Sequence, residues 1–332
     1  FTGIVQGVGF RPLVSMLAHQ LGINGFVYND SSGVYVEAQS DTDTLQLFVD
    51  TIQEEQPRLC RITHVGITKV APHDVDDNTE FVISKSPLEG TVNTFISADT
   101  SPCEDCLSEM NEKGRRYHYP FINCTNCGPR YSIIKSMPYD RERTTMSDFT
   151  MCEACHDEYV DVNGRRYHAE PNACEQCGPS YQLLDNNGNL CVVDDCFEVA
   201  REMIAKGAII ALKGIGGYHL VCDATNDTAV QTLRDRKHRK DKPFAIMAGS
   251  IDIVEEFAIV SDGDLDALSS MARPIVLLEK NDDFHTSISE LVAPNNHLIG
   301  VMLPYAPIHH VLVPHDAKWV MTSGNASGDS VI

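Results

Sequence analysis

Eight of the twelve cysteines stand in Cys-x-x-Cys pairs between residues 103 and 177. A Cys-x-x-Cys turn points two thiolates at one ion, and a second such turn completes a tetrahedron of sulfurs, the usual coordination of structural zinc. Protein ligands then fill every coordination position, so such a site has a structural role. The spacing predicts two structural Zn²⁺ ions held by Cys103, Cys106, Cys124, Cys127, Cys152, Cys155, Cys174 and Cys177.

The cysteine-rich segment is an internal duplication. Residues 104–132 are echoed by 153–182, with the strings GRRYH and CGP recurring in register. The repeat favours adjacent pairs sharing one ion, although crossed pairing is also compatible with the spacing. Disulfides are rare in cytosolic chains, and a redox Cys-x-x-Cys normally occurs once. The four remaining cysteines lack metal-ligand spacing and are interpreted as ordinary thiols: Cys60, Cys191, Cys196 and Cys222.

A second chemical motif lies at the start of the chain, in the string FTGIVQGVGFRP. Its glycines let backbone N–H groups converge, and a helix beginning near Arg11 adds its positive end. This combination is typical of a phosphate cradle. The predicted cradle consists of Gln6, Gly7, Val8, Gly9 and Phe10.

The elements that position this cradle follow in order. The helix ends at Gly22, and strands are predicted at 23–28 and 34–38 on either side of an NDSSG turn. A second helix begins after Asp41 or Asp43, and two strands follow near 63–70 and 80–84. With a largely truncated first strand, the order is βαββαβ, a ferredoxin-like sandwich.

The glycine loop and the strand ending in Asn29 resemble the acylphosphatase signature. The resemblance implies that Arg11 clamps a phosphoryl group and that Asn29 orients the attacking water. A guanidinium grips a dianion with two donors, and a carboxamide positions water without ionising. The alternative interpretation is a surface helix arginine and a hairpin-turn asparagine.

Basic and glycine-rich motifs appear again after residue 186, at the ends of predicted elements and between them. Strands are predicted at 207–213, after the following glycine turn, and near 244–247, 274–278 and 319–321. Helices capped by Asp194 or Asp195, and by Asn226 or Asp227, alternate with these strands, which predicts an α/β domain with a twisted mixed sheet. Lys213 precedes a Gly-Ile-Gly-Gly turn, and the string TSGNASG occupies residues 322–328. Taken alone, the cluster at 237–242 is as compatible with a solvated face as with a binding site.

In this order the motifs resemble the YrdC family, whose members form acyl-adenylates. The resemblance implies that Lys237, Arg239 and Lys242 hold phosphates, that Ser323 and Asn325 hold the nucleotide, and that Lys213 is a further phosphate ligand. The family loop more often reads TSAN, so Gly324 departs from the pattern.

The three modules together resemble the HypF carbamoyltransferases of [NiFe]-hydrogenase maturation. The resemblance implies hydrolysis of carbamoyl phosphate to carbamate, activation of carbamate with ATP and Mg²⁺ as carbamoyl-adenylate, and transfer to a HypE thiol. In that family transfer belongs to a further domain, so this chain is expected to lack the last step. The predicted divisions are an acylphosphatase-like domain at 1–87, a linker at 88–101, a zinc module at 102–185 and a YrdC-like domain at 186–332.

Composition limits the alternatives. The 332 residues carry a net charge of −21, which disfavours a nucleic-acid partner. No apolar run approaches a membrane span, and a cytoplasmic location is predicted. A threonylcarbamoyl-adenylate synthase for tRNA modification would leave the first two modules unexplained. A zinc-module adaptor would make Arg11, Asn29 and the basic cluster coincidences. His118, His168 and His219 are interpreted first as packing residues, and second as residues of a carbamate path or active site.

Overall fold

The computed structural model describes residues 1–70, 80–87 and 94–325. Two compact units emerge, residues 1–99 with 122–179 and residues 100–121 with 180–332. The boundaries predicted at 87, 101 and 185 remain a prediction. No helix within the described ranges is long and apolar enough to cross a membrane.

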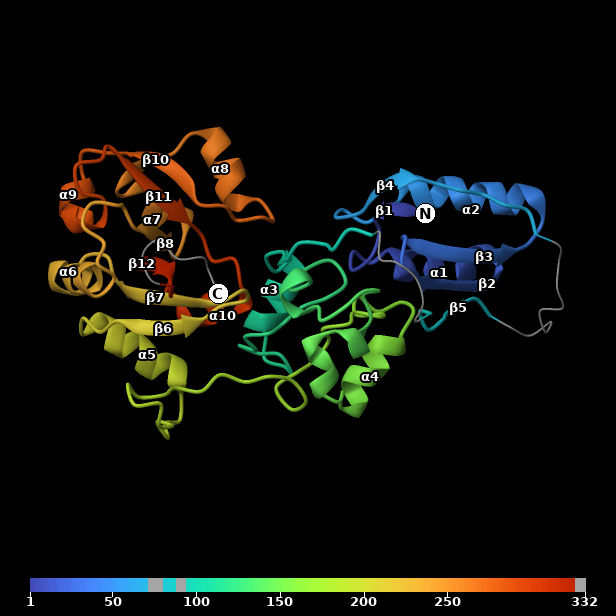
Figure 1. The fold of residues 1–332 in the computed structure, drawn as a ribbon, viewed down its shortest axis with the longest axis horizontal. Coiled ribbons are helices and arrows are strands. Elements are labelled where there is room, and N and C mark those ends of the chain that lie inside the picture. Colours follow the sequence, from blue (N-terminus) through green and yellow to red (C-terminus); the bar gives the residue numbers. More distant parts are fainter. Residues whose placement is uncertain (71–79, 88–93, 326–332) are drawn as a thin grey trace. The chain divides into compact units, whose positions relative to one another are not determined.

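The first unit opens with a small α/β sandwich (Figure 1). Its elements are β1 (Thr2–Ile4), α1 (Phe10–Leu21), β2 (Asn24–Asn29), β3 (Val34–Gln39), α2 (Thr42–Glu54), β4 (Arg61–His64) and β5 (Val82–Ile83). β1 pairs with β4, and β3, β2 and β5 form a second group. Hydrogen bonds of 2.9 Å in both directions between Phe1 and Val34 connect the two groups. The short first strand therefore does form, and the predicted ferredoxin-like α+β class is confirmed.

Local signals explain the two helices. Gly22 ends α1 in the left-handed conformation, with φ of 64°, and its N–H returns to the last turn. Asp41, one of the two predicted caps, accepts a hydrogen bond from the Thr44 N–H at the start of α2. α1 packs against α2, β2 and β5.

The strand predictions after α2 were too long. β4 ends at His64, so residues 65–70 lie outside it, and β5 covers two residues of the predicted 80–84. Ile67 and Val70 are more than half exposed. Alternating apolar residues therefore gave a strand pattern where the segment buries no face.

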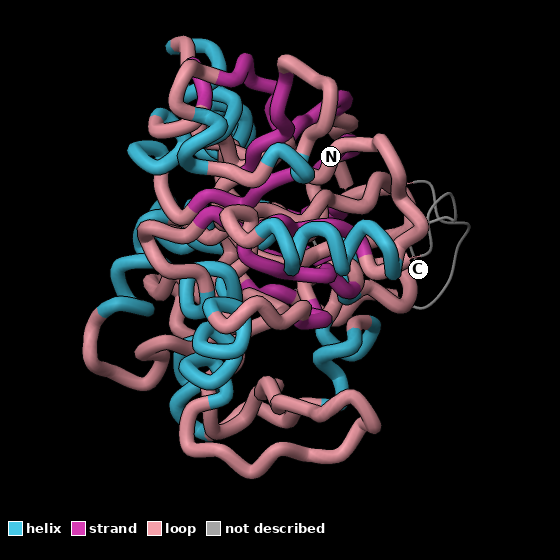
Figure 2. The backbone as a smooth tube through the Cα atoms, turned by 90° about the vertical axis from the view of Figure 1, so that its left-hand side faces the viewer, coloured by secondary structure: helices cyan, strands magenta, loops and turns pink. Residues whose placement is uncertain are grey.

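The cysteine-rich segments contain little regular structure. Each begins with a short helix, α3 (Glu104–Asn111) or α4 (Glu153–Val160), directly after the first cysteine of the repeat. Residues 112–152, all of which the structure describes, contain three 3₁₀ turns and no α-helix. Figure 2 shows loops and turns in pink, and segments of this kind need other constraints to hold one conformation.

The second unit is a seven-stranded mixed sheet in the order β6-β7-β12-β8-β11-β10-β9, which confirms the predicted sheet. Its strands are β6 (Ile210–Lys213), β7 (Tyr218–Asp223), β8 (Ala245–Ala248), β9 (Ala258–Ile259), β10 (Val276–Lys280), β11 (Leu298–Met302) and β12 (Lys318–Ser323). Its helices are α5 (Cys196–Ala205), α6 (Asp227–Arg236), α7 (Ile251–Glu255), α8 (Asp262–Ser269), α9 (Phe284–Ser287) and α10 (Pro307–Leu312). Asp195 caps α5 and Asn226 caps α6.

Both faces of the central strands of this sheet are buried. Ile246 and Val320 lie in one core with side chains of α6, α7 and α8, while Met247 and Trp319 lie in another with side chains of α5 and α10. Successive residues of a strand point to opposite faces, so a strand buried on both sides reads as a continuous apolar run. The end of β12 and the residues directly after it contribute to the second candidate site of the chain.

Candidate functional site

The glycine loop before α1 has the geometry of an anion cradle. Gly7 and Gly9 have φ of 71° and 80°, a conformation that glycine adopts without strain. Within the described part of the chain, the backbone N–H groups of Gly7, Val8 and Gly9 donate to no acceptor. Together with the positive end of a 12-residue helix, they favour a bound anion.

The cradle residues contribute backbone, because their side chains have other contacts. Val8 and Phe10 are buried in the core of the sandwich. The Gln6 Nε2 donates to the carbonyls of Asp30 and Gly33, at 2.8 and 2.6 Å, which ties the loop to the turn between β2 and β3. The side chain of Gln6 is therefore structural.

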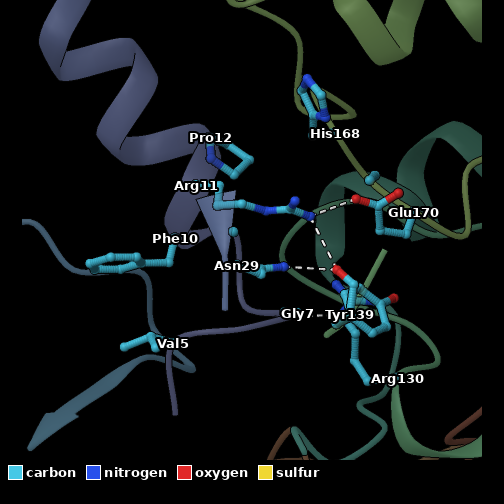
Figure 3. A pocket seen from close by; sticks show the side chains of 12 residues that line it. Val5, Gly7, Phe10, Arg11, Pro12, Asn29, Arg130, Tyr139, His168 and Glu170 are labelled. Carbon is cyan, nitrogen blue, oxygen red and sulfur yellow. Dashed lines mark hydrogen bonds and ion pairs between the residues drawn. The ribbon is translucent and has the colours of Figure 1, made fainter. Parts of the chain in front are cut away.

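Arg11 and Asn29 come together at this loop, as the motif predicted (Figure 3). Arg11 is on the first turn of α1, Asn29 ends β2, and both line the same cavity. Asn29 is fully buried, and its Nδ2 donates to the Tyr139 carbonyl at 2.8 Å. Its Oδ1 has no donor among the described residues, which suits it to accept a hydrogen bond from a water molecule.

Arg11 already has partners. Its Nη1 lies 2.6 Å from an Asp140 carboxylate oxygen, and its Nη2 lies 2.7 Å from Glu170 and 3.2 Å from the Tyr139 carbonyl. Burial opposes the charge of Arg11, but the two carboxylates outweigh it and raise the pKa of the guanidinium. The space left in the cavity is about 20 Å³, roughly enough for one water molecule.

Sequence reasoning did not identify three residues that line this cavity, Arg130, Tyr139 and Glu170, or the Asp140 that pairs with Arg11. None of them stands in a recognised motif, although Glu170 follows the repeated GRRYH string by two residues. His168, the last residue of that string, also lines the cavity. Burial, with the charge of Arg11 second, lowers the pKa of His168 to about 3, so its imidazole is neutral at pH 7. His118, its counterpart in the first repeat, is exposed and stacks on Tyr117.

The eight predicted metal ligands form two groups by adjacent pairing, and the crossed alternative is excluded. The sulfurs of Cys103, Cys106, Cys124 and Cys127 lie within 4.8 Å of one another, as do those of Cys152, Cys155, Cys174 and Cys177. The S···S separations are 3.6 Å for Cys124–Cys127 and 3.8 Å for Cys174–Cys177. Four sulfurs at about 2.3 Å from one zinc ion would lie about 3.8 Å apart, so each group fits tetrahedral zinc.

The electrostatics of the second cluster also favour thiolates. Burial opposes the charge of Cys177, but hydrogen bonds involving Cys152, Cys174 and Cys155 lower its pKa to about 7. Thiolate is the form that binds metal. The other four cysteines belong to neither cluster, and Cys60 and Cys222 are buried in apolar cores.

In the second unit, two of the predicted basic residues meet the strand-end loop. Lys237 donates to the carbonyls of Ser323 and Asn325, both at 2.7 Å. Arg239 lies 3.4 Å from the Thr322 hydroxyl, and the side chains of Ser323 and Asn325 bond each other. These residues form one polar group at the end of β12. Residues 326–328 of the predicted loop lie outside the described residues.

The other two predicted basic residues lie at the edge of this group. Lys242 has an exposed side chain, and its carbonyl accepts from Arg239 at 3.0 Å. Lys213 ends β6 and lies over the Tyr218 ring at 5.0 Å, and the Tyr218 carbonyl accepts from the Gly324 N–H. Their roles in phosphate binding remain predictions.

Sequence reasoning missed the residue that shapes the basic loop. Arg234 is 4% exposed and donates to the carbonyls of Arg239, Lys240 and Leu291. His219 pairs with Ser323 across β7 and β12, and its Nε2 lies 3.1 Å from the Tyr305 hydroxyl. Burial lowers the pKa of His219.

Sequence families divide the chain in the order that the motifs predicted. Residues 1–83 match the acylphosphatase family, and residues 103–134 and 151–184 match the HypF finger. Residues 202–332 match the Sua5/YciO/YrdC family, described as telomere recombination. An acylphosphatase of Lactiplantibacillus plantarum is 34% identical over 77 residues, 23% of this chain and 86% of that protein.

Matches over nearly the whole chain join these parts. The carbamoyltransferase HypF of Rhodobacter capsulatus is 44% identical over 327 residues, 98% of this chain and 42% of that protein. The crystal structure of full-length HypF in the phosphate- and nucleotide-bound form has a TM-score of 0.91 at 43% identity, covering 99% of this chain and 43% of that one. The chain belongs to the HypF family. It spans less than half the length of the HypF proteins that it matches.

Proposed function

We propose that this HypF-family chain hydrolyses carbamoyl phosphate and then activates the product with ATP. The observation that carries the first step is the convergence of Arg11, Asn29 and the free N–H groups of the glycine loop on one cavity. Arg11 and the loop would hold the phosphoryl oxygens. Asn29 would position the water whose oxygen bonds to phosphorus as carbamate leaves with the bridging oxygen.

The second step would take place at the polar group around β12. Lys237 and Arg239 place two cations at a loop of hydroxyl and amide groups, which supports binding of ATP phosphates. A carbamate oxygen would bond to the α-phosphorus and pyrophosphate would leave, with Mg²⁺ accompanying the nucleotide as substrate. The acceptor would be a HypE thiol.

Two structural zinc ions would hold the cysteine clusters. A cytoplasmic location, where thiols stay reduced, suits a fold that uses eight of them as ligands. The matches to HypF proteins over nearly the whole of this chain favour carbamoyl transfer over threonylcarbamoyl-adenylate synthesis, because the tRNA-modifying alternative accounts for residues 202–332 alone.

Phosphate release from carbamoyl phosphate tests the proposal. We expect Arg11→Ala to lower kcat/KM by about 10³-fold or more and Asn29→Ala by about 10²-fold, because each removes a group acting on the reacting centre. Arg58→Ala, at an exposed arginine of the same unit, is the matched control. Zinc content is measured for every variant, so that unfolding is not read as lost chemistry. Equal rates in wild type and zinc-loaded Arg11→Ala would refute the assignment.

A further inference from the structure

The arginine assigned to phosphoryl binding is held by two carboxylates from distant parts of the chain, of which Figure 3 shows that of Glu170. The Asp140 carboxylate accepts a hydrogen bond from Arg11 Nη1 at 2.6 Å, and the Glu170 carboxylate accepts one from Arg11 Nη2 at 2.7 Å. These nitrogens are the two donors with which a guanidinium grips a phosphoryl group. Both carboxylates lie beyond the residues matched to the acylphosphatase family, which end at residue 83.

The two carboxylates are held very differently. Glu170 is 2% exposed, and its second oxygen accepts from the Tyr159 hydroxyl and the Arg141 N–H, both at 3.0 Å. Its carbonyl also accepts from Arg141 Nη1. Glu170 is therefore fixed from several sides whether or not Arg11 is present.

Asp140 has weaker anchorage. Its side chain is 24% exposed, and among the described residues its carboxylate has Arg11 as its hydrogen-bond partner. The Asp140 carboxylate carries one negative charge and is partly open to solvent. A phosphoryl dianion can replace it at the guanidinium, because the dianion also accepts hydrogen bonds from the loop N–H groups. The cavity of about 20 Å³ must widen for a phosphoryl group. Displacing Asp140 frees the Nη1 of Arg11 for that group without disturbing Glu170.

We propose, on the basis of the proposed function, that Asp140 is a built-in competitor which the phosphoryl group displaces, whereas Glu170 is a positioning residue that keeps Arg11 aimed at the cradle. The acylphosphatase-like site of this chain is thus completed by the cysteine-rich segment. Asp140 sets how tightly the anion binds, and Glu170 sets how well the bound anion reacts.

Binding of inorganic phosphate to the full chain, measured by calorimetry, tests the role of Asp140 without turnover. Asp140→Asn should tighten phosphate binding by about fivefold, the upper range for a partly exposed ion pair. Glu142→Gln is the control, because Glu142 is an exposed neighbour whose partner is the exposed Lys85. Unchanged or weaker binding by Asp140→Asn would overturn the competitor role.

Steady-state hydrolysis of carbamoyl phosphate tests Glu170. Glu170→Gln keeps the shape but not the charge, and should lower kcat by about tenfold or more with a smaller change in KM, because a misaimed guanidinium still attracts the anion. Tyr159→Phe, which removes one hydrogen bond to Glu170, should lower kcat by a few-fold. This variant replaces Glu170→Gln in the test if Glu170→Gln fails to fold. A change in KM alone in these variants would overturn the positioning role.

The two measurements separate this inference from the proposed function. Tighter phosphate binding by Asp140→Asn in a chain that releases no phosphate would support the competitor while refuting hydrolysis. Wild-type hydrolysis with both acidic variants indistinguishable from wild type would leave the proposed function standing and overturn the inference. In that case Asp140 and Glu170 serve only to join the segments of the first unit.

Discussion

At the scale of single residues, counting donors separates a structural cation from a binding one. Arg130 is 2% exposed, and all three of its guanidinium nitrogens donate to backbone carbonyls, including those of Gly7 and Cys124. Lys237 is 6% exposed, and its ammonium donates to two carbonyls. An ammonium has three donors, so Lys237 retains one for a ligand, while Arg130 fastens the glycine loop to a cysteine turn.

Replacement of Lys237 should therefore weaken nucleotide binding. Lys237→Ala removes a phosphate donor and also frees the loop at Ser323 and Asn325, so we expect ATP to bind at least about tenfold more weakly. Equilibrium binding of ATP measures the effect. Lys240→Ala, at an exposed lysine of the same cluster, should bind ATP like wild type. Equal weakening by both variants would point to a diffuse charge effect instead.

At the scale of elements, glycines fix where the chain turns toward the cradle. Gly22 ends α1 in open space, whereas Gly25 lies within β2 at φ of 144°, and a Cβ there would come 2.0 Å from the Glu37 carbonyl oxygen. Gly22 is required only because its φ is positive. At Gly25 the φ is also positive, and in addition there is no room for a side chain on the strand that carries Asn29.

The two glycines should respond differently to alanine. Gly22→Ala is expected to lower the free energy of unfolding by about 1 kcal/mol, the cost of a left-handed alanine. Gly25→Ala should cost at least about 3 kcal/mol, because backbone strain and a clash add. Urea unfolding of the first unit, followed in the full chain, measures both free energies. Similar costs would mean that β2 and β3 move apart easily.

At the scale of the whole molecule, metal binding and the candidate active site share a segment. Glu170 lies four residues before Cys174, and the intervening Asn172 donates to the Cys155 carbonyl at 2.9 Å. The second cysteine cluster therefore fixes the segment from Glu170 to Cys174, whose first residue holds Arg11. Because these segments have little regular structure, we expect their order to depend on a bound ion.

Zinc removal should reach beyond the cysteine clusters. We expect two zinc ions per chain by metal analysis, and about one in Cys152→Ser. That variant should also hydrolyse carbamoyl phosphate more slowly, because Glu170 is no longer fixed. Cys191→Ser, at a cysteine outside both clusters, should keep two ions and full activity. Normal activity in Cys152→Ser that carries a single zinc ion would contradict this dependence.

The second unit should also lose stability in mild acid. Burial, with Arg273 second, lowers the pKa of His310 to about 4, so between about pH 6.5 and 4 the unfolded chain binds more protons than the folded chain. Stability then falls as pH falls, by about 2 kcal/mol from pH 7 to pH 5 for this group. Trp319, the single tryptophan, reports unfolding of this unit by fluorescence.

A matched pair of variants isolates this histidine. His310→Gln should flatten the dependence of the urea midpoint on pH, whereas His315→Gln, at an exposed position, should leave it unchanged. Identical slopes in wild type and His310→Gln would show that another group controls the acid sensitivity. Burial also lowers the pKa of the neighbouring His309, so some dependence should persist in the variant.

The sequence by itself predicted the cysteine ligands, two neighbouring candidates for the cap of each of three helices, the glycine cradle with Arg11 and Asn29, and the order of the modules. Each of these depends on contacts within a few residues, or on spacings that chemistry constrains. Only the tertiary structure decided that adjacent cysteine pairs share an ion and that Asp140 and Glu170 hold Arg11, across 129 and 159 residues. Such ion pairs leave no periodic or local pattern, because any exposed loop can carry an acidic residue and only folding brings it to its partner.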